Sequence, residues 1–455
     1  MGLFDGLKRR AAEGRPVRVG IVGAGKFGSM YLSQAPRTPG IHLIGVADLS
    51  PPRAMDSLRR VGWADERFAA RSLDEAARTG GACVTEDADA MIASPHVDIV
   101  IEATGSPAAG IHHALRAFAH GKHVVMVNVE ADVLAGPLLA RRAAEAGVIC
   151  SLASGDQPAL IAELVDWART IGLDVVCAGK GTKYLPVYHS STPDTVWGHY
   201  GFTPERAAAD RLNPQMFNSF LDGTKSALEM AAVANACALT PPRDGLLFPS
   251  CGVDDLPTVL RPIADGGLLE RRGTVEVVSS LERDGRPVFR DLRWGVYAVF
   301  EAPTPYVAEC FAQYGLKTDG TGRYAATYKP YHLIGLELGT SIASIAVRGE
   351  ATGSTSEWRG DVAATAKRDL RAGERLDGEG GYTVYGKLIP AADALAQDAL
   401  PIGLAHDMVL KCDVPAGSAV RWSAVDYDAG REAVAVRREM ETMFRGEGDA
   451  RRRER

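Results

Sequence analysis

A glycine-rich turn directly after an apolar strand constrains this chain more than any other feature. The segment VRVGIV at residues 17–22 is followed by Gly23, Gly25 and Gly28 in the spacing G-x-G-x-x-G, and then by helix formers. A strand, a tight turn and a helix in this order bring backbone N–H groups and the positive end of a helix dipole together, where phosphate binds. The segment therefore predicts the first β–α unit of a Rossmann-type, dinucleotide-binding domain.

An acidic residue follows at the distance that this kind of domain uses for a ribose. Asp48 lies 20 residues after Gly28, at the end of the next expected strand. A carboxylate there can accept hydrogen bonds from the adenosine ribose hydroxyls, and its charge repels a 2′-phosphate, which favours NAD. The nearby Arg53 could accommodate that phosphate, so NADP stays open as the cofactor.

Strands and helices keep alternating through the first third of the chain. Apolar runs at 97–107, 122–132 and 147–158 are separated by helical stretches near 107–120 and 132–146. Unbroken apolar strands between helices indicate a parallel sheet that is buried on both faces, with ligands at the strand ends. The predicted cofactor-binding residues are Gly23, Gly25, Lys26, Phe27, Gly28, Asp48, Arg53, Ala103, Thr104, Gly105, Asn128 and Glu130.

The middle of the chain loses this strict alternation. A helix is expected at 157–171 and a strand directly after it, and then comes a polar, aromatic segment at 184–217. Further strands are expected at residues 274–283, 293–302 and 343–351. Strands and helices without strict alternation indicate an α+β substrate domain.

One expected helix of this domain carries charges on an otherwise apolar sequence. Residues 218–236 are rich in Ala, Leu and Met, yet Asp222, Lys225 and Glu229 occur at i, i+3 and i+7 and would share one face. A solvated stripe is the ordinary interpretation. Beside a nucleotide site, the row could instead bind and protonate a substrate carbonyl, with Lys225 and Asp222 in the active site and Glu229 behind them.

The last part of the chain has a different pattern. The motif Lys-x-Asp-hydrophobic-x-Ala-Gly occurs at 367–373 and again at 411–417, and each copy indicates a strand, a tight turn and another strand. We therefore expect a small all-β module. The predicted domains are a Rossmann domain at 1–155, an α+β catalytic domain at 156–352, the β module at 353–440 and a polar tail at 441–455.

Together these segments resemble a known group of enzymes. The motifs GAGKFG, IEATG, GKHVVMVNVEADV, GDQP, AGKG, DGTKSALEMAAVANA and KPYHLIGLE resemble the homoserine-dehydrogenase-like oxidoreductases of the deoxyxylulose-phosphate reductoisomerase-like (DRL) type. The β module resembles an SAF domain. The resemblance implies dimerisation through the α+β domain. It also implies NADPH as the cofactor, whereas Asp48 favours NAD. The segment 184–201 differs from the family pattern and indicates a different substrate wall.

Hydride transfer needs a group that holds the substrate oxygen while it gains or loses a proton. Lys180 and Lys183 follow a strand and could stabilise a developing alkoxide. The alternative is that they are anchoring lysines at the protein surface. Homoserine dehydrogenases place a lysine where this chain has Glu130. Asp156 could be a base or a helix cap, and His332 a substrate contact or a structural residue. The candidate catalytic residues are Lys180, Lys183, Asp222, Lys225, Glu229, Asp156 and His332.

The leading functional hypothesis is an NAD(P)-dependent oxidoreductase for a small polyhydroxylated or branched anionic substrate, with or without a skeletal rearrangement. A plain hydroxy-acid dehydrogenase and a non-catalytic nucleotide sensor are the alternatives. The net charge of -6 gives no reason to expect nucleic acid, and no apolar run is long enough for a membrane. Seven cysteines without a CxxC pair indicate reduced thiols in a cytoplasm. The sequence has no His/Cys cluster of the kind that binds a transition metal. A Mg²⁺ ion held by carboxylates stays open.

Overall fold

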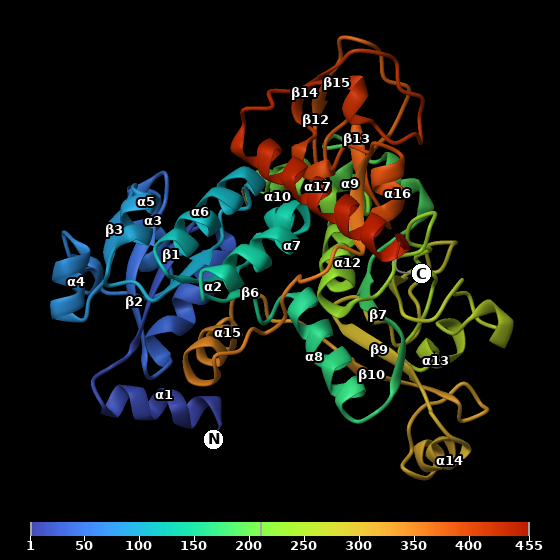
Figure 1. The fold of residues 1–455 in the computed structure, drawn as a ribbon, viewed down its shortest axis with the longest axis horizontal. Coiled ribbons are helices and arrows are strands. Elements are labelled where there is room, and N and C mark those ends of the chain that lie inside the picture. Colours follow the sequence, from blue (N-terminus) through green and yellow to red (C-terminus); the bar gives the residue numbers. More distant parts are fainter. Residues whose placement is uncertain (1, 210–211, 454–455) are drawn as a thin grey trace. The chain divides into compact units, whose positions relative to one another are not determined.

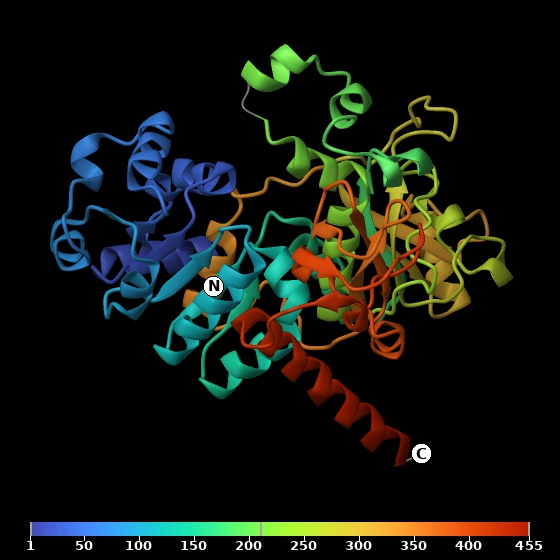
Figure 2. The same ribbon diagram turned by 90° about the horizontal axis from the view of Figure 1, so that it is seen from above.

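The computed structural model describes residues 2–209 and 212–453 (Figures 1 and 2). The chain divides into two compact units, each made of two stretches of sequence: Met1–Leu160 with His332–Ser356 in unit 1, and Ile161–Tyr331 with Glu357–Arg455 in unit 2. The four sequence-based domains stay a prediction. The segment 332–356, expected with the central domain as far as residue 352 and with the β module after it, groups with unit 1.

Unit 1 is built on a six-stranded parallel sheet with the order β3-β2-β1-β4-β5-β6. The strands are β1 (Val17–Val22), β2 (Ile41–Ala47), β3 (Cys83–Thr85), β4 (Ile99–Glu102), β5 (His123–Met126) and β6 (Cys150–Leu152). The helices are α1 (Leu3–Ala12), α2 (Lys26–Gln34), α3 (Pro51–Arg60), α4 (Leu73–Thr79), α5 (Ala88–Ala93), α6 (Pro107–Ala119) and α7 (Val129–Glu145), with 3₁₀ turns η1 (Ala35–Arg37) and η2 (Asp65–Phe68). The Rossmann-type domain predicted from the glycine turn is confirmed.

The returning segment of unit 1 is helical, and the strand expected at 343–351 is wrong. Residues Gly339–Ala343 form α15, and Ser344–Arg348 form the π-helical turn η5. Leu338, Ile342 and Ile345 recur at helical spacing and join the core of the Rossmann sheet. The apolar residues of this segment follow the period of a helix and not the alternation of a strand.

Unit 2 contains a four-stranded mixed sheet with the order β10-β9-β7-β8. The strands are β7 (Asp174–Thr182), β8 (Thr274–Ser279), β9 (Val296–Glu301) and β10 (Tyr324–Lys329). The helices before and around this sheet are α8 (Gln157–Thr170), α9 (Val196–Tyr200), α10 (Pro204–Ala209), α11 (Pro214–Leu221), α12 (Thr224–Cys237), α13 (Leu256–Val259) and α14 (Pro305–Gln313), with η3 (Pro186–Ser190) and η4 (Ile263–Asp265). This part is the expected α+β arrangement.

The helix expected at 218–236 is broken, so its three charges do not share one helix face. α11 ends at Leu221, and Asp222 and Gly223 form a turn in which Gly223 has φ of 91°. A Cβ at Gly223 would also lie 3.1 Å from His189 Cε1, so both the backbone and the contact favour glycine. α12 then contacts β7 and β8 on one side and the C-terminal strands β11 (Gly360–Ala366) and β13 (Val384–Pro390) on another.

The C-terminal part of unit 2 consists of small antiparallel sheets and a long last helix. β11 pairs with β13, and β12 (Arg375–Asp377), β14 (His406–Leu410) and β15 (Val425–Asp426) form a second sheet. Helical elements here are α16 (Ala391–Ala396), η6 (Ile402–Leu404), η7 (Trp422–Ala424) and α17 (Glu432–Arg453). The predicted polar tail at 441–455 lies within α17 as far as Arg453, and residues 454 and 455 lie outside the described residues. Figure 2 shows the last turns of α17 extending beyond these strands.

The two copies of the repeated motif pair with each other. Leu370 and Val414 exchange both backbone hydrogen bonds at 2.9 Å. Asp369 of the first copy accepts the Ala416 N–H at 2.9 Å, and Asp413 of the second accepts the Ala372 N–H at 2.9 Å. Each aspartate therefore caps the turn of the other copy, which explains why this spacing occurs twice.

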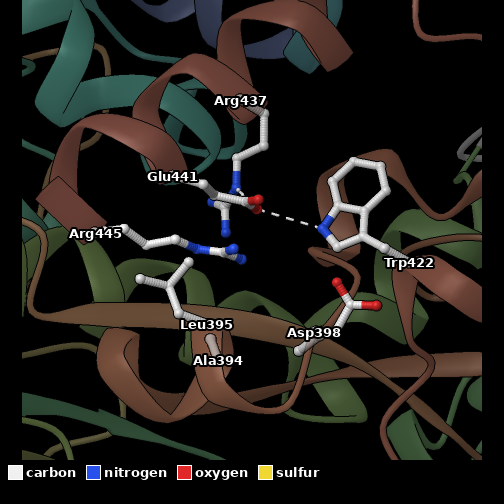
Figure 3. Close-up of a pocket in the computed structure, with 8 residues that line it drawn as sticks. Ala394, Leu395, Asp398, Trp422, Arg437, Glu441 and Arg445 are labelled. Atoms are coloured by element: carbon white, nitrogen blue, oxygen red, sulfur yellow. Dashed lines mark hydrogen bonds and ion pairs between the residues drawn. The ribbon is translucent and has the colours of Figure 1, made fainter.

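A buried arginine fastens α17 to β11. The Arg437 side chain is 1% exposed; it forms an ion pair with Asp361 and donates from Nε to Glu441 Oε1 at 2.9 Å. Glu441 also accepts from Trp422 Nε1 at 3.3 Å, as Figure 3 shows. The guanidinium lies 4.8 Å from the centroid of the Trp358 ring. Charge and aromatic contacts together hold the helix on the sheet.

We predict that Arg437→Met destabilises the protein strongly, because it leaves the buried Asp361 carboxylate without its cation, while Glu441 keeps Arg438. Loss of one partner of a buried pair costs about 3–5 kcal/mol. Chemical denaturation measures the change in the free energy of unfolding. Arg371→Met is the matched control, since Arg371 pairs with Asp413 at the surface and its removal should leave the transition unchanged. An equal effect of the two substitutions would contradict the prediction.

Candidate active site

The glycine turn of unit 1 is shaped to receive a phosphate group. Gly23 has φ of 100°, and a Cβ there would lie 2.6 Å from the Ala103 carbonyl oxygen. A Cβ at Gly28 would lie 2.5 Å from the Gly23 oxygen, whereas a Cβ at Gly25 would meet nothing within 4 Å. Gly23 and Gly28 are therefore required by the turn itself. Gly25 leaves open space at the N-terminus of α2, where a pyrophosphate fits.

Asp48 directly follows β2, and hydrogen bonds fix the position of its side chain. Its Oδ2 accepts the Ala24 N–H at 2.9 Å, and its Oδ1 accepts from Ser50 N at 2.9 Å and Arg53 Nη2 at 3.0 Å. Burial raises the pKa of Asp48, but these hydrogen bonds and the Arg53 charge outweigh it, so the pKa lies below its usual value. The side chain is thus an ionised acceptor next to the glycine turn, with Arg53 held against it.

The other predicted cofactor residues lie around the same strand ends. Ala103, Thr104 and Gly105 follow β4, and the Thr104 hydroxyl donates to Glu102 Oε1 at 2.5 Å. Lys26 and Phe27 form the first turn of α2, and Glu130 lies buried in the first turn of α7. Asn128 has a clear structural role, because it caps α7 through Ala131 N and donates to the Ser106 carbonyl at 2.8 Å.

Glu102 is a residue that the sequence reasoning missed. Its side chain is fully buried at the end of β4, where it accepts from Thr104 and contacts His113 Nδ1 at 3.3 Å. The motif IEATG contained the signal, since burial of an acid in an apolar strand costs free energy unless the acid has hydrogen-bond partners. In the structure, Glu102 fixes the orientation of the Thr104 hydroxyl.

Asp156 and His332 both belong to unit 1. Asp156 is 6% exposed and accepts the Gln157 N–H at 2.9 Å at the start of α8. The preceding Gly155 has φ of 91°, and its Cβ would lie 2.7 Å from the Leu333 oxygen, so the Asp156 turn lies against the segment that carries His332. The turn of Asp156 and the segment of His332, which carry two of the seven predicted catalytic residues, therefore lie next to each other in unit 1.

The other five candidates belong to unit 2, and two of them form a buried ion pair. Lys180 on β7 and Glu229 on α12 are paired, with residue exposures of 6% and 3%. A desolvated lysine interacts with its partners with little screening by water. The pair explains why α12 carries an acid on a buried face.

Lys183 and Lys225 have different surroundings. Lys183 Nζ donates to the His199 carbonyl oxygen at 2.6 Å and lies 5.6 Å from the centroid of the Tyr200 ring. Burial, and then the charge of Arg293, lower the pKa of Lys183. Lys225 is half-buried in the first turn of α12. Of the unit 2 lysine candidates, Lys183 is thus engaged with the segment that was expected to form a substrate wall.

Asp222 does not line an open surface, since its side chain is fully buried. Its Oδ1 accepts the Thr224 N–H at 2.9 Å, and its Oδ2 lies 2.8 Å from Lys367 Nζ. Burial raises the pKa of Asp222, although Lys367 and Thr224 oppose the shift. Sequence reasoning missed Lys367, which lies 145 residues away in the β module.

A histidine that the sequence reasoning also missed lies beside this turn. The Asp222 carbonyl can only accept, so His189 Nδ1 donates to it at 2.7 Å. Burial lowers the pKa of His189, and the neutral ring then accepts the Tyr184 hydroxyl at Nε2, at 2.9 Å. Tyr184 stacks on Phe248 at 4.0 Å between ring centroids, and Tyr385 of β13 lies 4.7 Å from the imidazole.

Glu276 supports this aromatic group from β8. Its buried carboxyl accepts N–H groups from Leu247, Phe248 and Val277, at 2.8 to 3.3 Å. Burial raises its pKa to about 7, because desolvation outweighs the three hydrogen bonds. These contacts hold Phe248 at its positive φ of 49°, under the Tyr184 ring.

The described residues, 2–209 and 212–453, contain no group of three or more His, Cys, Asp or Glu side chains placed to hold a metal ion. A search of the same stretches finds no helix with the length and apolarity that a membrane crossing requires.

Two family models match the chain. Residues 155–338 match the catalytic domain of oxidoreductase DRL, and residues 23–153 match the NAD binding domain of homoserine dehydrogenase. The resemblance to homoserine-dehydrogenase-like and DRL oxidoreductases that was predicted from the motifs is confirmed by these two matches. The SAF resemblance of the C-terminal module stays a prediction.

Individual relatives match in part. A 1-deoxy-D-xylulose 5-phosphate reductoisomerase of Anaeromyxobacter dehalogenans is 33% identical over 161 residues, which cover 33% of this chain and 41% of the relative. A homoserine dehydrogenase of Pseudomonas aeruginosa is 29% identical over 137 residues, covering 30% and 28%. The solved structure of a reductoisomerase from Zymomonas mobilis with NADPH is 21% identical, with a TM-score of 0.33, over 48% of this chain and 57% of that one. The chain spans less than half the length of these two curated relatives.

Gly25→Ala should weaken cofactor binding without unfolding the protein. The new methyl group meets no protein atom within 4 Å, but it occupies the space left for the pyrophosphate. We expect the Kd for NADH to rise at least about tenfold, an expected cost for a misplaced phosphate contact, with an unchanged melting temperature. Fluorescence titration measures the Kd. Gly28→Ala is the contrast, since its methyl group clashes with the Gly23 oxygen and should lower the melting temperature as well; a normal NADH Kd for Gly25→Ala would refute the model of the turn.

Glu276→Gln should remove a pH dependence of stability. The folded pKa of about 7 lies above the unfolded value of about 4.3. The protonated carboxyl therefore stabilises the fold fully below that unfolded value, and this contribution is lost as the pH rises toward 7, by up to ~1.4 kcal/mol per pH unit. Denaturation of both proteins from pH 4.5 to 8 checks this, and parallel pH profiles would contradict it.

Proposed function

We propose that this chain, in which an NAD-binding domain of the homoserine dehydrogenase type precedes a DRL catalytic domain, is an NAD(P)-dependent oxidoreductase. Its substrate would be a small polyhydroxylated or branched anion, such as a sugar acid or sugar phosphate. The observation that carries the proposal is the glycine turn, where Gly23 and Gly28 fit only as glycines and Gly25 leaves a space for phosphate. The matched families support the reaction class.

We propose NAD as the preferred cofactor. Asp48 is held as an ionised acceptor by two backbone N–H groups, and a carboxylate at this point repels a 2′-phosphate. The alternative is NADP, for which Arg53 would have to leave its 3.0 Å contact with Asp48 and pair with the phosphate. Either cofactor would supply the hydride chemistry, so the protein needs only to position substrate and handle a proton.

Unit 2 supplies the groups suited to an anionic substrate and its oxygen. Lys180 is the strongest candidate for holding a developing alkoxide, because its amino group pairs with Glu229 in a desolvated place. Lys225, half-buried at the start of α12, suits a contact to an anionic group. Within unit 1, Asp156 and His332 stay candidates for a base and a substrate contact.

The coupling of hydride transfer to a rearrangement is part of the proposal, and so is a homodimer in a cytoplasmic setting. The 33% identity over 161 residues to a 1-deoxy-D-xylulose 5-phosphate reductoisomerase supports the rearrangement. The described cysteines are all free, which supports a reducing compartment. A plain hydroxy-acid dehydrogenase shares every group named above, so product analysis separates the two reactions.

The decisive experiment is a panel of sugar acids, sugar phosphates and hydroxy acids, tested with NAD, NADP and their reduced forms. Absorbance of the reduced nicotinamide reports turnover, and mass spectrometry of the product reports a rearrangement. We expect turnover of an anionic polyol with NAD. Stoichiometric cofactor binding without turnover of any compound would favour a nucleotide-sensing role instead.

Lys180→Met should lower kcat by at least about two orders of magnitude, the scale of a lost electrostatic contact to a reacting oxygen. The substitution also leaves Glu229 buried without its cation, which destabilises the fold. The double variant Lys180→Met/Glu229→Gln removes both charges and should restore the melting temperature while kcat stays low. Wild-type kcat in a well-folded double variant would exclude Lys180 as a catalytic residue.

A further inference from the structure

A lysine of the C-terminal strands is buried in the interior of unit 2. Lys367 directly follows β11, and its side chain is 3% exposed. Its Nζ lies 2.8 Å from Asp222 Oδ2 and donates to the carbonyl oxygens of Ser191 at 2.8 Å and Gly381 at 2.7 Å. The ammonium therefore donates two hydrogen bonds to backbone carbonyls and forms an ion pair with Asp222.

The repeated motif provides an internal comparison for this lysine. Lys367 and Lys411 occupy the same position in the two copies, 367–373 and 411–417, which pair with each other through Asp369 and Asp413. Lys411 is exposed, whereas Lys367 is buried against residues far from the motif. The pairing of the repeats therefore does not require a buried lysine, and the burial of Lys367 serves something else.

The contacts of Lys367 converge on the turn before α12. Asp222 caps Thr224 N through Oδ1, and its carbonyl accepts His189 Nδ1. Ser191, which receives Lys367 at its carbonyl, also donates from Oγ to Asn218 Oδ1 at 2.6 Å on α11. One ammonium thus joins the loop of His189 to the junction of α11 and α12.

A loop of the same module fastens the neighbouring segment. Gln215 Nε2 donates to the carbonyl oxygens of Asp377 and Glu379, at 2.9 and 3.0 Å. Asn218 Nδ2 donates to the Gly380 oxygen at 2.9 Å, and the Tyr382 hydroxyl donates to Asp194 at 2.9 Å. Residues 377–382 therefore hold Asp194, Gln215 and Asn218, while Lys367 holds the Ser191 carbonyl.

We propose that Lys367 is a positioning residue of the oxidoreductase site, through which the C-terminal module sets the place of His189 and of the first turn of α12 with Lys225. The expected effect of Lys367 on turnover rests on the proposed function. Its expected effect on the position of the loop and the helix start rests on the contacts alone. Lys367 itself reaches no substrate. It acts through Asp222 and Ser191, whose backbone groups carry the loop and the helix start.

The test compares Lys367→Met with Lys411→Met and with the double variant Lys367→Met/Asp222→Asn. Hydrogen–deuterium exchange followed by mass spectrometry reports position, and kcat on the best substrate of the panel reports function. We expect Lys367→Met to raise exchange in residues 186–191 and 222–226 and to lower kcat, each at least about tenfold, in line with the cost of small misplacements. Exchange in the four-stranded sheet and the Kd for NADH should not change, and Lys411→Met should behave as wild type.

The double variant separates positioning from stability. It removes the unpaired buried carboxylate, so the melting temperature should recover, but methionine donates nothing to the Ser191 and Gly381 carbonyls, so fast exchange and low kcat should persist. Recovery of exchange and kcat together with stability would overturn the inference, as would unchanged local exchange in Lys367→Met. If the wild-type protein turns over no compound, the proposed function fails, and the exchange data still decide whether Lys367 positions the loop.

Discussion

A carboxylate that leaves water keeps its charge only when a cation leaves with it, and unit 2 depends on this constraint. Glu229 is paired with Lys180, Asp222 with Lys367, and Asp361 with Arg437. These pairs join α12 to β7, the α11–α12 junction to the end of β11, and α17 to the start of β11. The helices and sheets of this unit are thus connected by charges at fixed points, in addition to apolar packing.

Much of unit 1 could be predicted from the sequence because its signals are local. A strand, three glycines and a helix follow each other within a few residues, and close backbone contacts leave no room for a side chain at Gly23 and Gly28. Asp48 and Arg53 were predicted at their places for the same reason. Glu102 was missed because a buried acid has no periodic signature; what justifies it is the hydroxyl of Thr104 two residues later.

Unit 2 was harder to predict because its partners are distant in sequence. The stripe of Asp222, Lys225 and Glu229 appeared to be one helix face, but Gly223 breaks the helix and each acid pairs with a lysine that is distant in sequence. The residue types in the stripe indicated charged contacts, but the expected arrangement of the three residues on one helix face was wrong. Likewise, the repeat at 367–373 and 411–417 predicted strands and turns, whereas the different surroundings of its two lysines depend on tertiary contacts.

The return of residues 332–356 to unit 1 has a consequence for how the chain is made. The backbone passes from one unit to the other after residues 160, 331 and 356, so residues 161–331 are effectively inserted into the Rossmann unit. All six strands of its sheet have been synthesised by residue 160, but Leu338, Ile342 and Ile345, which complete its core, leave the ribosome much later. No single truncation separates the units, and a nascent chain stopped before α15 holds an open Rossmann core that a chaperone would recognise as unfinished.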